Sequence, residues 1–92
     1  MKIYIVERDN PKEWIEPEVF ADGKKALDIV RKEYETQMSE LGTSQEKADK
    51  GFGNYGCYWQ FEEDSCVGSA CIDSDCDCDQ WKWRITEHEI EK

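Results

Sequence analysis

The sequence has few positive charges for its size. It contains 12 lysine and arginine residues against 22 aspartate and glutamate residues, which gives a formal net charge of −10. Nucleic-acid-binding proteins displace counterions with clustered basic side chains, and anionic membrane surfaces attract the same side chains. The composition therefore argues against direct binding of nucleic acid or of a membrane surface.

Long apolar segments are also missing. No apolar run approaches the roughly 18 residues of a transmembrane helix, and the opening Met1-Lys2-Ile3-Tyr4 lacks the pattern of a signal peptide. With 92 residues the chain is long enough for one domain, which we expect to span residues 1–92. These features predict a soluble, cytoplasmic protein.

Motifs of the common enzyme classes are absent as well. The sequence contains no Gly-rich phosphate loop, no G-x-S-x-G and no H-E-x-x-H. Its one histidine, His88, lies between Glu87 and Glu89. A Cys–His nucleophile pair is formally available, but a lone histidine at a charged strand end is more often a solvated surface residue. We therefore expect no enzymatic activity.

Apolar periodicity predicts one amphipathic helix at about 22–41. Asp22 is suited to cap its N-terminus, and Gly42 is a typical residue just after a helix C-terminus. Thr43 and Glu46 have the spacing of a capping box, which predicts one further helical turn. A single apolar stripe runs along the main helix at steps of three and four residues: Leu27, Val30, Tyr34, Met38 and Leu41.

Alternating or β-branched apolar residues predict four extended segments, at about 2–8, 14–20, 55–61 and 81–90. Pro17 cannot donate a hydrogen bond within a sheet, so the second segment is expected at an edge. The last two segments have matching apolar faces. We therefore expect them to pair with each other.

Together these elements predict an α+β domain. Three or four mostly antiparallel strands would bury one face against the single amphipathic helix. Residues 64–80 would form a Cys/Asp-rich insertion between two of the strands. The expected core consists of the apolar residues on the inner faces: Ile3, Ile5, Phe20, Leu27, Val30, Tyr34, Met38, Trp59, Phe61, Trp81, Trp83 and Ile85.

The insertion contains four cysteines spaced C-x4-C-x4-C-x-C. Thiolates from Cys66, Cys71, Cys76 and Cys78 could bind one zinc ion in a tetrahedral site, although the usual C-x2-C pairs are missing. Alternatively the cysteines form disulfides, or they stay reduced in a flexible acidic loop. A calcium-binding EF-hand loop is excluded, because the required glycine and glutamate are missing. Apart from this zinc ion, no cofactor is expected.

Acidic residues are concentrated toward the C-terminus. Residues 62–92 hold 10 acidic and 3 basic residues, so they carry −7 of the net charge. Carboxylates on a rigid sheet could occupy a basic groove that normally binds a phosphate backbone, and their charge would speed association with such a partner. The candidate binding residues are Glu62, Glu63, Asp64, Asp73, Asp75, Asp77, Asp79, Glu87, Glu89 and Glu91.

Three segments carry a resemblance to a known class of proteins. They are Met1-Lys2-Ile3-Tyr4-Ile5-Val6, Val19-Phe20 followed by Ala26-Leu27-Asp28-Ile29-Val30, and Trp83-Arg84-Ile85-Thr86-Glu87-His88-Glu89-Ile90. Their layout is similar to that of small phage and mobile-element proteins. The similarity covers most of the chain except 43–56 and 64–80, and it assigns no functional residue. It implies a stoichiometric inhibitor of a host defence, as anti-CRISPR proteins are.

Two functional hypotheses follow. The first is an acidic protein that mimics DNA and inhibits a nucleic-acid-handling enzyme in the cytoplasm of a bacterial host, through contact with a basic protein surface. The second is a small Cys-rich module with a structural zinc ion or a redox role. We prefer the first, because the acidic C-terminal third and the missing catalytic motifs both agree with it.

Overall fold

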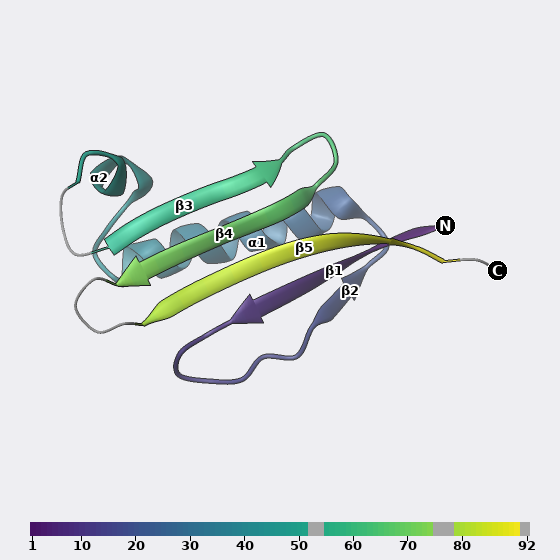
Figure 1. Ribbon diagram of the computed structural model, residues 1–92, viewed down its shortest axis with the longest axis horizontal. Coiled ribbons are helices and arrows are strands. Elements are labelled where there is room, and N and C mark those ends of the chain that lie inside the picture. Colours follow the sequence, from purple (N-terminus) through teal and green to yellow (C-terminus); the bar gives the residue numbers. More distant parts are fainter. Residues whose placement is uncertain (52–54, 75–78, 91–92) are drawn as a thin grey trace.

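The computed structural model describes residues 1–51, 55–74 and 79–90. These residues form a five-stranded antiparallel sheet with one long helix packed on it (Figure 1). The predicted α+β class is confirmed, although the sheet has five strands instead of three or four. In chain order the elements are β1 (Lys2–Asp9), β2 (Glu18–Phe20), α1 (Gly23–Glu40), α2 (Gln45–Asp49), β3 (Tyr55–Glu62), β4 (Val67–Ser74) and β5 (Gln80–Glu89).

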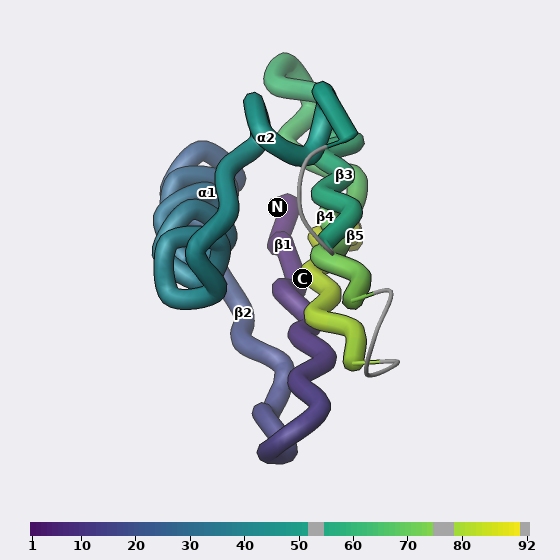
Figure 2. Tube along the Cα trace, turned by 90° about the vertical axis from the view of Figure 1, so that its left-hand side faces the viewer, coloured from purple at the N-terminus to yellow at the C-terminus, as the bar shows by residue number. Residues whose placement is uncertain are grey.

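The strand order in the sheet is β2-β1-β5-β4-β3, and all neighbouring strands are antiparallel. The last strand of the chain, β5, therefore lies in the centre, while β2 and β3 form the two edges. Helix α1 lies against one face of the sheet, and no described element covers the other face (Figure 2). The edge position of β2 agrees with the expectation from Pro17.

Helix α1 forms where the apolar stripe predicts it. The Asp22 side chain accepts a hydrogen bond of 3.0 Å from the Lys24 backbone N–H and so caps the N-terminus. Gly42 follows the last turn with a φ of 74°, a left-handed conformation that favours glycine. The stripe faces the sheet, and its members Leu27, Val30, Tyr34 and Met38 are buried together with Ala26, whereas its last member, Leu41, is half-buried.

The inner face of β1 differs from the prediction. Ile3 and Ile5 were expected in the core, but Val6 is the fully buried residue of this strand, and Ile3 and Ile5 point to the uncovered face. Both alternating sets of side chains in this strand contain apolar residues, so periodicity alone could not choose between them. Pairing with β5 decides the matter, because Val6 lies opposite the buried Ile85.

The largest correction concerns the predicted insertion at 64–80. Residues 67–74 of it form β4, which lies between β3 and β5 and pairs with both. The expected direct pairing of 55–61 with 81–90 is therefore wrong. Ala70 and Ile72 of β4 are 3% and 0% exposed and belong to the core.

The aromatic part of the core is close to what the sequence predicts. Trp81 and Trp83 are buried beneath α1, and Tyr34 of α1 packs edge-on against Trp83 with ring centroids 5.6 Å apart. Trp59 and Phe61 are half-buried, because β3 is an edge strand and not a central one. Their rings contact each other with centroids 4.6 Å apart.

An ion pair under α1 was not predicted. The Arg8 guanidinium, on the helix side of β1, donates hydrogen bonds of 2.7 and 3.0 Å to the two Glu33 carboxylate oxygens and one of 3.0 Å to Glu18. The Trp83 indole N–H donates a further bond of 3.2 Å to Glu33. The bond to Glu33 is the main cause that raises the pKa of Arg8 above its ordinary value. This network connects α1 to three strands.

Helix α2 is anchored to the edge of the sheet. Ser44, and not the expected Thr43, caps it and accepts a hydrogen bond from the Lys47 backbone N–H. The Gln45 side chain connects three elements: its Oε1 accepts a bond of 2.6 Å from the Tyr34 hydroxyl, and its Nε2 donates one of 2.8 Å to the Cys57 carbonyl. As a result, α2 covers the beginning of β3.

Candidate functional site

The predicted acidic residues lie at opposite ends of the sheet. Glu62 at the end of β3 and Glu63 and Asp64 in the turn that follows it are all exposed, and we call these three residues the acidic turn. Asp73 and Asp79 lie at the other end of β4, where the Ser74 N–H donates a bond of 2.9 Å to the Asp79 carbonyl. Asp75, Asp77 and Glu91 lie outside the described residues.

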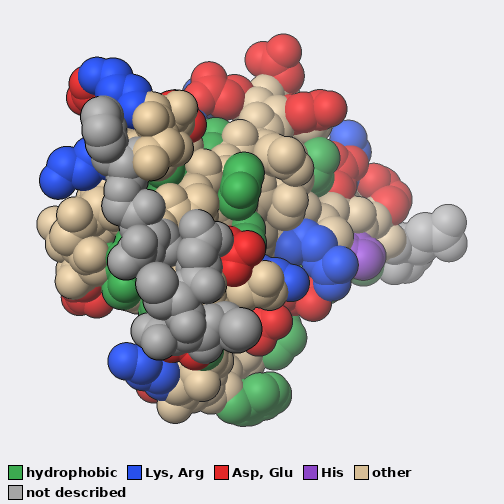
Figure 3. All heavy atoms as spheres, turned by 60° about the vertical axis from the view of Figure 1, so that its left-hand side comes forward, with side chains coloured by type: hydrophobic (Ala, Val, Ile, Leu, Met, Phe, Trp, Pro, Cys, Tyr) green, Lys and Arg blue, Asp and Glu red, His purple; other side chains and the backbone are tan. Residues whose placement is uncertain are grey.

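Glu87 and Glu89 lie at the same end of the sheet as the acidic turn, at the end of β5. The structure therefore does not gather the predicted residues on one surface. Asp and Glu side chains form separate groups on the face in Figure 3, with Lys and Arg between several of them.

Several of these carboxylates are paired with cations. Glu63 contacts Arg31 at 2.7 Å, Glu87 contacts Lys2 at 3.2 Å, and Glu89 contacts the N-terminal ammonium at 3.2 Å. Such exposed pairs add little to stability, because water and salt screen them. They do reduce the charge available to a partner. Within the described chain, Glu62 and Asp64 have no ion pair, and Glu62 only accepts a hydrogen bond of 3.2 Å from the Ser65 hydroxyl, so both charges stay available to a partner.

We expect the Glu63 carboxyl to titrate below its ordinary range. The hydrogen bond from Arg31, followed by its positive charge, lowers the pKa of Glu63. The pair is intact at neutral pH and is lost as the pH falls through the lowered pKa. An NMR titration of the side-chain carboxyl should show this pKa rising in Arg31→Gln. Lys24→Gln is the control and should raise it less, since Lys24 acts only by a weaker charge interaction. An unchanged titration in Arg31→Gln would contradict the pairing.

Two of the predicted metal ligands lie on different faces of the sheet. Cys66 is buried in the core, whereas Cys71 is half-buried on the uncovered face of β4. Four residues of β4 lie between them, and their extended backbone spans roughly 13 Å, while zinc-bound thiolates lie within about 2.3 Å of the ion. The structure therefore does not bring this pair together. No cluster of three metal-binding side chains occurs among the described residues, and Cys76 and Cys78 lie outside them.

The described thiols are free. Burial raises the pKa of Cys57 and Cys71, and the negative charges of Asp49 and Asp73 raise them further. Both thiols are therefore poorer nucleophiles and metal ligands than an ordinary cysteine at neutral pH. His88 contacts the Thr86 hydroxyl at 3.0 Å, toward the far end of β5 from Cys71.

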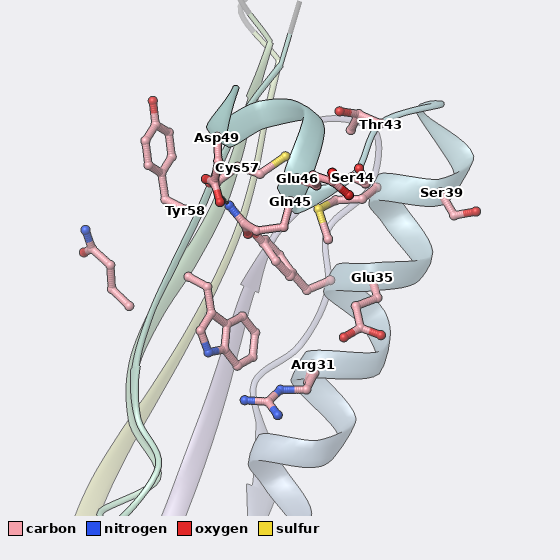
Figure 4. Close-up of a pocket in the computed structure, with 14 residues that line it drawn as sticks. Arg31, Glu35, Ser39, Thr43, Ser44, Gln45, Glu46, Asp49, Cys57 and Tyr58 are labelled. Carbon is pink, nitrogen blue, oxygen red and sulfur yellow. Dashed lines mark hydrogen bonds between the residues drawn. The ribbon is translucent and has the colours of Figure 1, made fainter. Parts of the chain in front are cut away.

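A groove that the sequence did not predict lies between α1 and β3. It has a volume of about 980 Å³, and α2 closes one end of it (Figure 4). Arg31 and Glu35 line its α1 side, Asp49 lines its α2 end, and Trp59 lines its β3 side. The apolar periodicity of the helix sequence places Glu35 on the solvent side of α1. It cannot show that the open edge of β3 lies across the groove from Glu35.

The basic side chain in this groove has an ion-pair partner, whereas two of its acidic side chains have none among the described residues. Arg31 is the only basic residue that lines it within the described chain, and it is held by Glu63 and by the Trp59 ring, whose centroid is 5.0 Å away. Glu35 and Asp49 have no ion pair within the same residues, and Asp49 only accepts a hydrogen bond from Gln45. The groove therefore has an excess of negative charge.

Comparisons of the chain with known protein families, with curated proteins and with solved structures found no match. In the part of the chain that the structure describes, no helix is both long and apolar enough to cross a membrane.

Proposed function

We propose that this chain is an acidic binding protein that occupies a basic groove on a nucleic-acid-handling enzyme of a bacterial host and inhibits it stoichiometrically. The observation that carries the proposal is the acidic turn. It presents three consecutive exposed carboxylates, Glu62, Glu63 and Asp64, at the end of a hairpin that eight residue pairs hold in place.

A rigid acidic turn suits a groove that normally binds phosphates. The hairpin already fixes the backbone that carries the carboxylates, so little backbone conformational entropy is lost when they bind. Glu62 and Asp64 are free of ion pairs within the described chain, and a Lys- or Arg-rich groove can pair with them directly. The net charge of −10 speeds the encounter with a positively charged partner and opposes nucleic acid.

A pull-down tests the proposal. The tagged protein is incubated with nuclease-treated bacterial lysate and eluted with a salt step. We expect one nucleic-acid-binding enzyme, released as the salt concentration rises. The purified enzyme should then lose nucleic acid binding at one equivalent of this protein. Recovery of no specific protein, or of an enzyme that still binds nucleic acid, would contradict the proposal.

Two double variants of equal net charge locate the contact. Glu62→Lys with Asp64→Lys reverses two charges in the acidic turn. Glu13→Lys with Glu16→Lys reverses two charges at exposed positions in the loop between β1 and β2. The first should weaken binding by about tenfold or more, because charges at the contact act at short range. The second should change it by less than about twofold, since screening weakens distant charges. Equal losses would show that only net charge matters.

A further inference from the structure

We propose that the free edge of β3 binds an extended, basic segment of the partner protein as an additional strand of the sheet. The inference rests on the proposed function, because it states how the partner is held, and it concerns a different surface from the acidic turn. Strand addition at a sheet edge is a common way to bind an extended peptide: backbone hydrogen bonds provide affinity, and side-chain pockets provide selectivity.

The pairing of β3 shows which backbone groups are free. In an antiparallel pair, successive residues point their N–H and C=O alternately toward the neighbouring strand and away from it. The Cys57 carbonyl points away from β4, since it accepts the bond from Gln45 of α2. The register from β3 to β4 is continuous, so Trp59 and Phe61 also point their N–H and C=O outward.

These outward groups are accessible to another chain. Helix α2 lies beside the beginning of β3, where Gln45 bonds to the Cys57 carbonyl, and the second half of the strand forms an open edge (Figure 1). No backbone or side-chain group in the described chain bonds to the outward N–H and C=O of Trp59 and Phe61. Two outward residues offer four hydrogen bonds, which is enough for a short strand of three to five residues.

The groove between α1 and β3 adjoins this edge on the helix side of the sheet. A residue that pairs with Trp59 would have its side chain on the same face as the Trp59 ring. That side chain would enter the groove toward Glu35, which has no ion pair within the described chain. Asp49 lies at the α2 end of the same groove. A basic side chain opposite Trp59 would therefore meet carboxylates.

The charge of the groove selects the occupant. Its one described cation, Arg31, is already held by Glu63 and the Trp59 ring, so an incoming lysine or arginine meets two carboxylates and no competing free cation. A second copy of this chain would bring another net charge of −10 to the same edge. Like charges at close range oppose such pairing. A basic segment of another protein is the occupant that fits.

NMR with a short peptide tests the inference without the partner. The ¹⁵N-labelled protein is titrated at low salt with a capped seven-residue peptide in which lysine alternates with valine. We expect saturable shifts centred on the Trp59 and Phe61 amides. Their hydrogen exchange should slow by about tenfold near saturation, because a bonded amide exchanges only after it is released.

A modified peptide separates backbone pairing from charge. When the lysine side chains face the groove, the lysine N–H groups are the ones that pair with β3. The same peptide with these amides N-methylated keeps its charge and should bind at least about tenfold more weakly. Equal binding of both peptides, or shifts confined to the acidic turn, would overturn strand addition and leave the proposed function intact. An absence of binding would overturn it too.

Two variants on α1 test the role of charge. Glu35→Lys should weaken the peptide by about tenfold, whereas Glu40→Lys, an exposed glutamate outside the groove, should change it by less than about twofold. Shifts at Trp59 that depend on protein concentration without peptide would indicate a second copy at the edge and overturn the inference. The peptide could bind as expected while charge reversal in the acidic turn leaves partner capture unchanged. In that case the acidic turn is not the contact with the partner, and strand addition at the edge of β3 is still supported.

Discussion

Replacing Ile72 with alanine is expected to lower the free energy of unfolding by about 2–5 kcal/mol. Ile72 is 0% exposed and lies in the middle of the core face of β4. Its neighbours across the sheet are Cys57 on β3 and Trp81 on β5, which are also buried. The substitution removes apolar contacts and leaves a cavity that the surrounding strands cannot fill. Chemical denaturation followed by tryptophan fluorescence would measure the change.

Ser69→Ala is the matched control for Ile72→Ala. Ser69 is on the same strand, but its side chain is on the uncovered face and only half-buried. Its replacement should change the free energy of unfolding by no more than about 0.5 kcal/mol. If both substitutions have equally small effects, residues 67–74 do not form a central strand, and the sequence-based expectation of a flexible acidic loop would be correct after all.

Gly68→Ala is expected to lower the free energy of unfolding by at least about 2 kcal/mol, because it combines backbone strain with a steric conflict. Gly68 has a φ of 143°, which side chains other than glycine rarely allow. A Cβ at this position would lie 2.2 Å from the Gln60 carbonyl oxygen and 2.7 Å from the Phe61 Cα. Both are backbone atoms of β3, so the hairpin itself would have to move.

Gly42→Ala separates strain from steric conflict. Gly42 also has a positive φ, of 74°, but a Cβ there would meet no atom within 4 Å. Its replacement should therefore cost only about 1 kcal/mol, the usual cost of a left-handed residue with a side chain. Similar denaturation midpoints for the two variants would contradict the close approach of β4 to β3. Because Gly68 adjoins the acidic turn, Gly68→Ala should also displace its carboxylates.

The elements predicted most accurately are those with a local signal. Helix α1 was predicted within a residue at each end, because its stripe, its cap at Asp22 and Gly42 all lie within the segment itself. The segments at 2–8 and 81–90 were also found, as β1 and β5. Choosing the inner face of β1 required knowing which residue of β5 lies opposite, and that information is not local.

β4 was missed because its composition obscures its periodicity. Ala70, Ile72 and Ser74 are the buried set, and only Ile72 is a strong apolar signal. The alternating residues include Cys71 and Asp73, which favoured a loop or metal-site interpretation of the same stretch. The strand is stabilised mainly by pairing with β3, which precedes it along the chain, and with β5, which follows it, so tertiary pairing outweighs local preference.

In the candidate site, too, the sequence predicts what depends on local signals and misses what depends on tertiary pairing. The sequence names the acidic residues, but their positions depend on the hairpin register, which places 62–64 and Asp73 at opposite ends of β4. The groove depends on α2 lying beside the beginning of β3 and on Glu35 lying across from an open edge. No spacing along the chain reports that arrangement, because it arises only when α1 packs on the sheet.

The central position of β5 determines when the protein can fold during synthesis. β1 is made first, but its longest ladder pairs residues 2–9 with residues 82–89. Until the last strand leaves the ribosome, the sheet consists of two separate halves, each with an additional open edge. Such long-range contacts slow folding and prolong the exposure of unpaired strands. A chain that stalls before β5 would therefore lack the strand that joins the halves, and it would be prone to aggregate or be degraded.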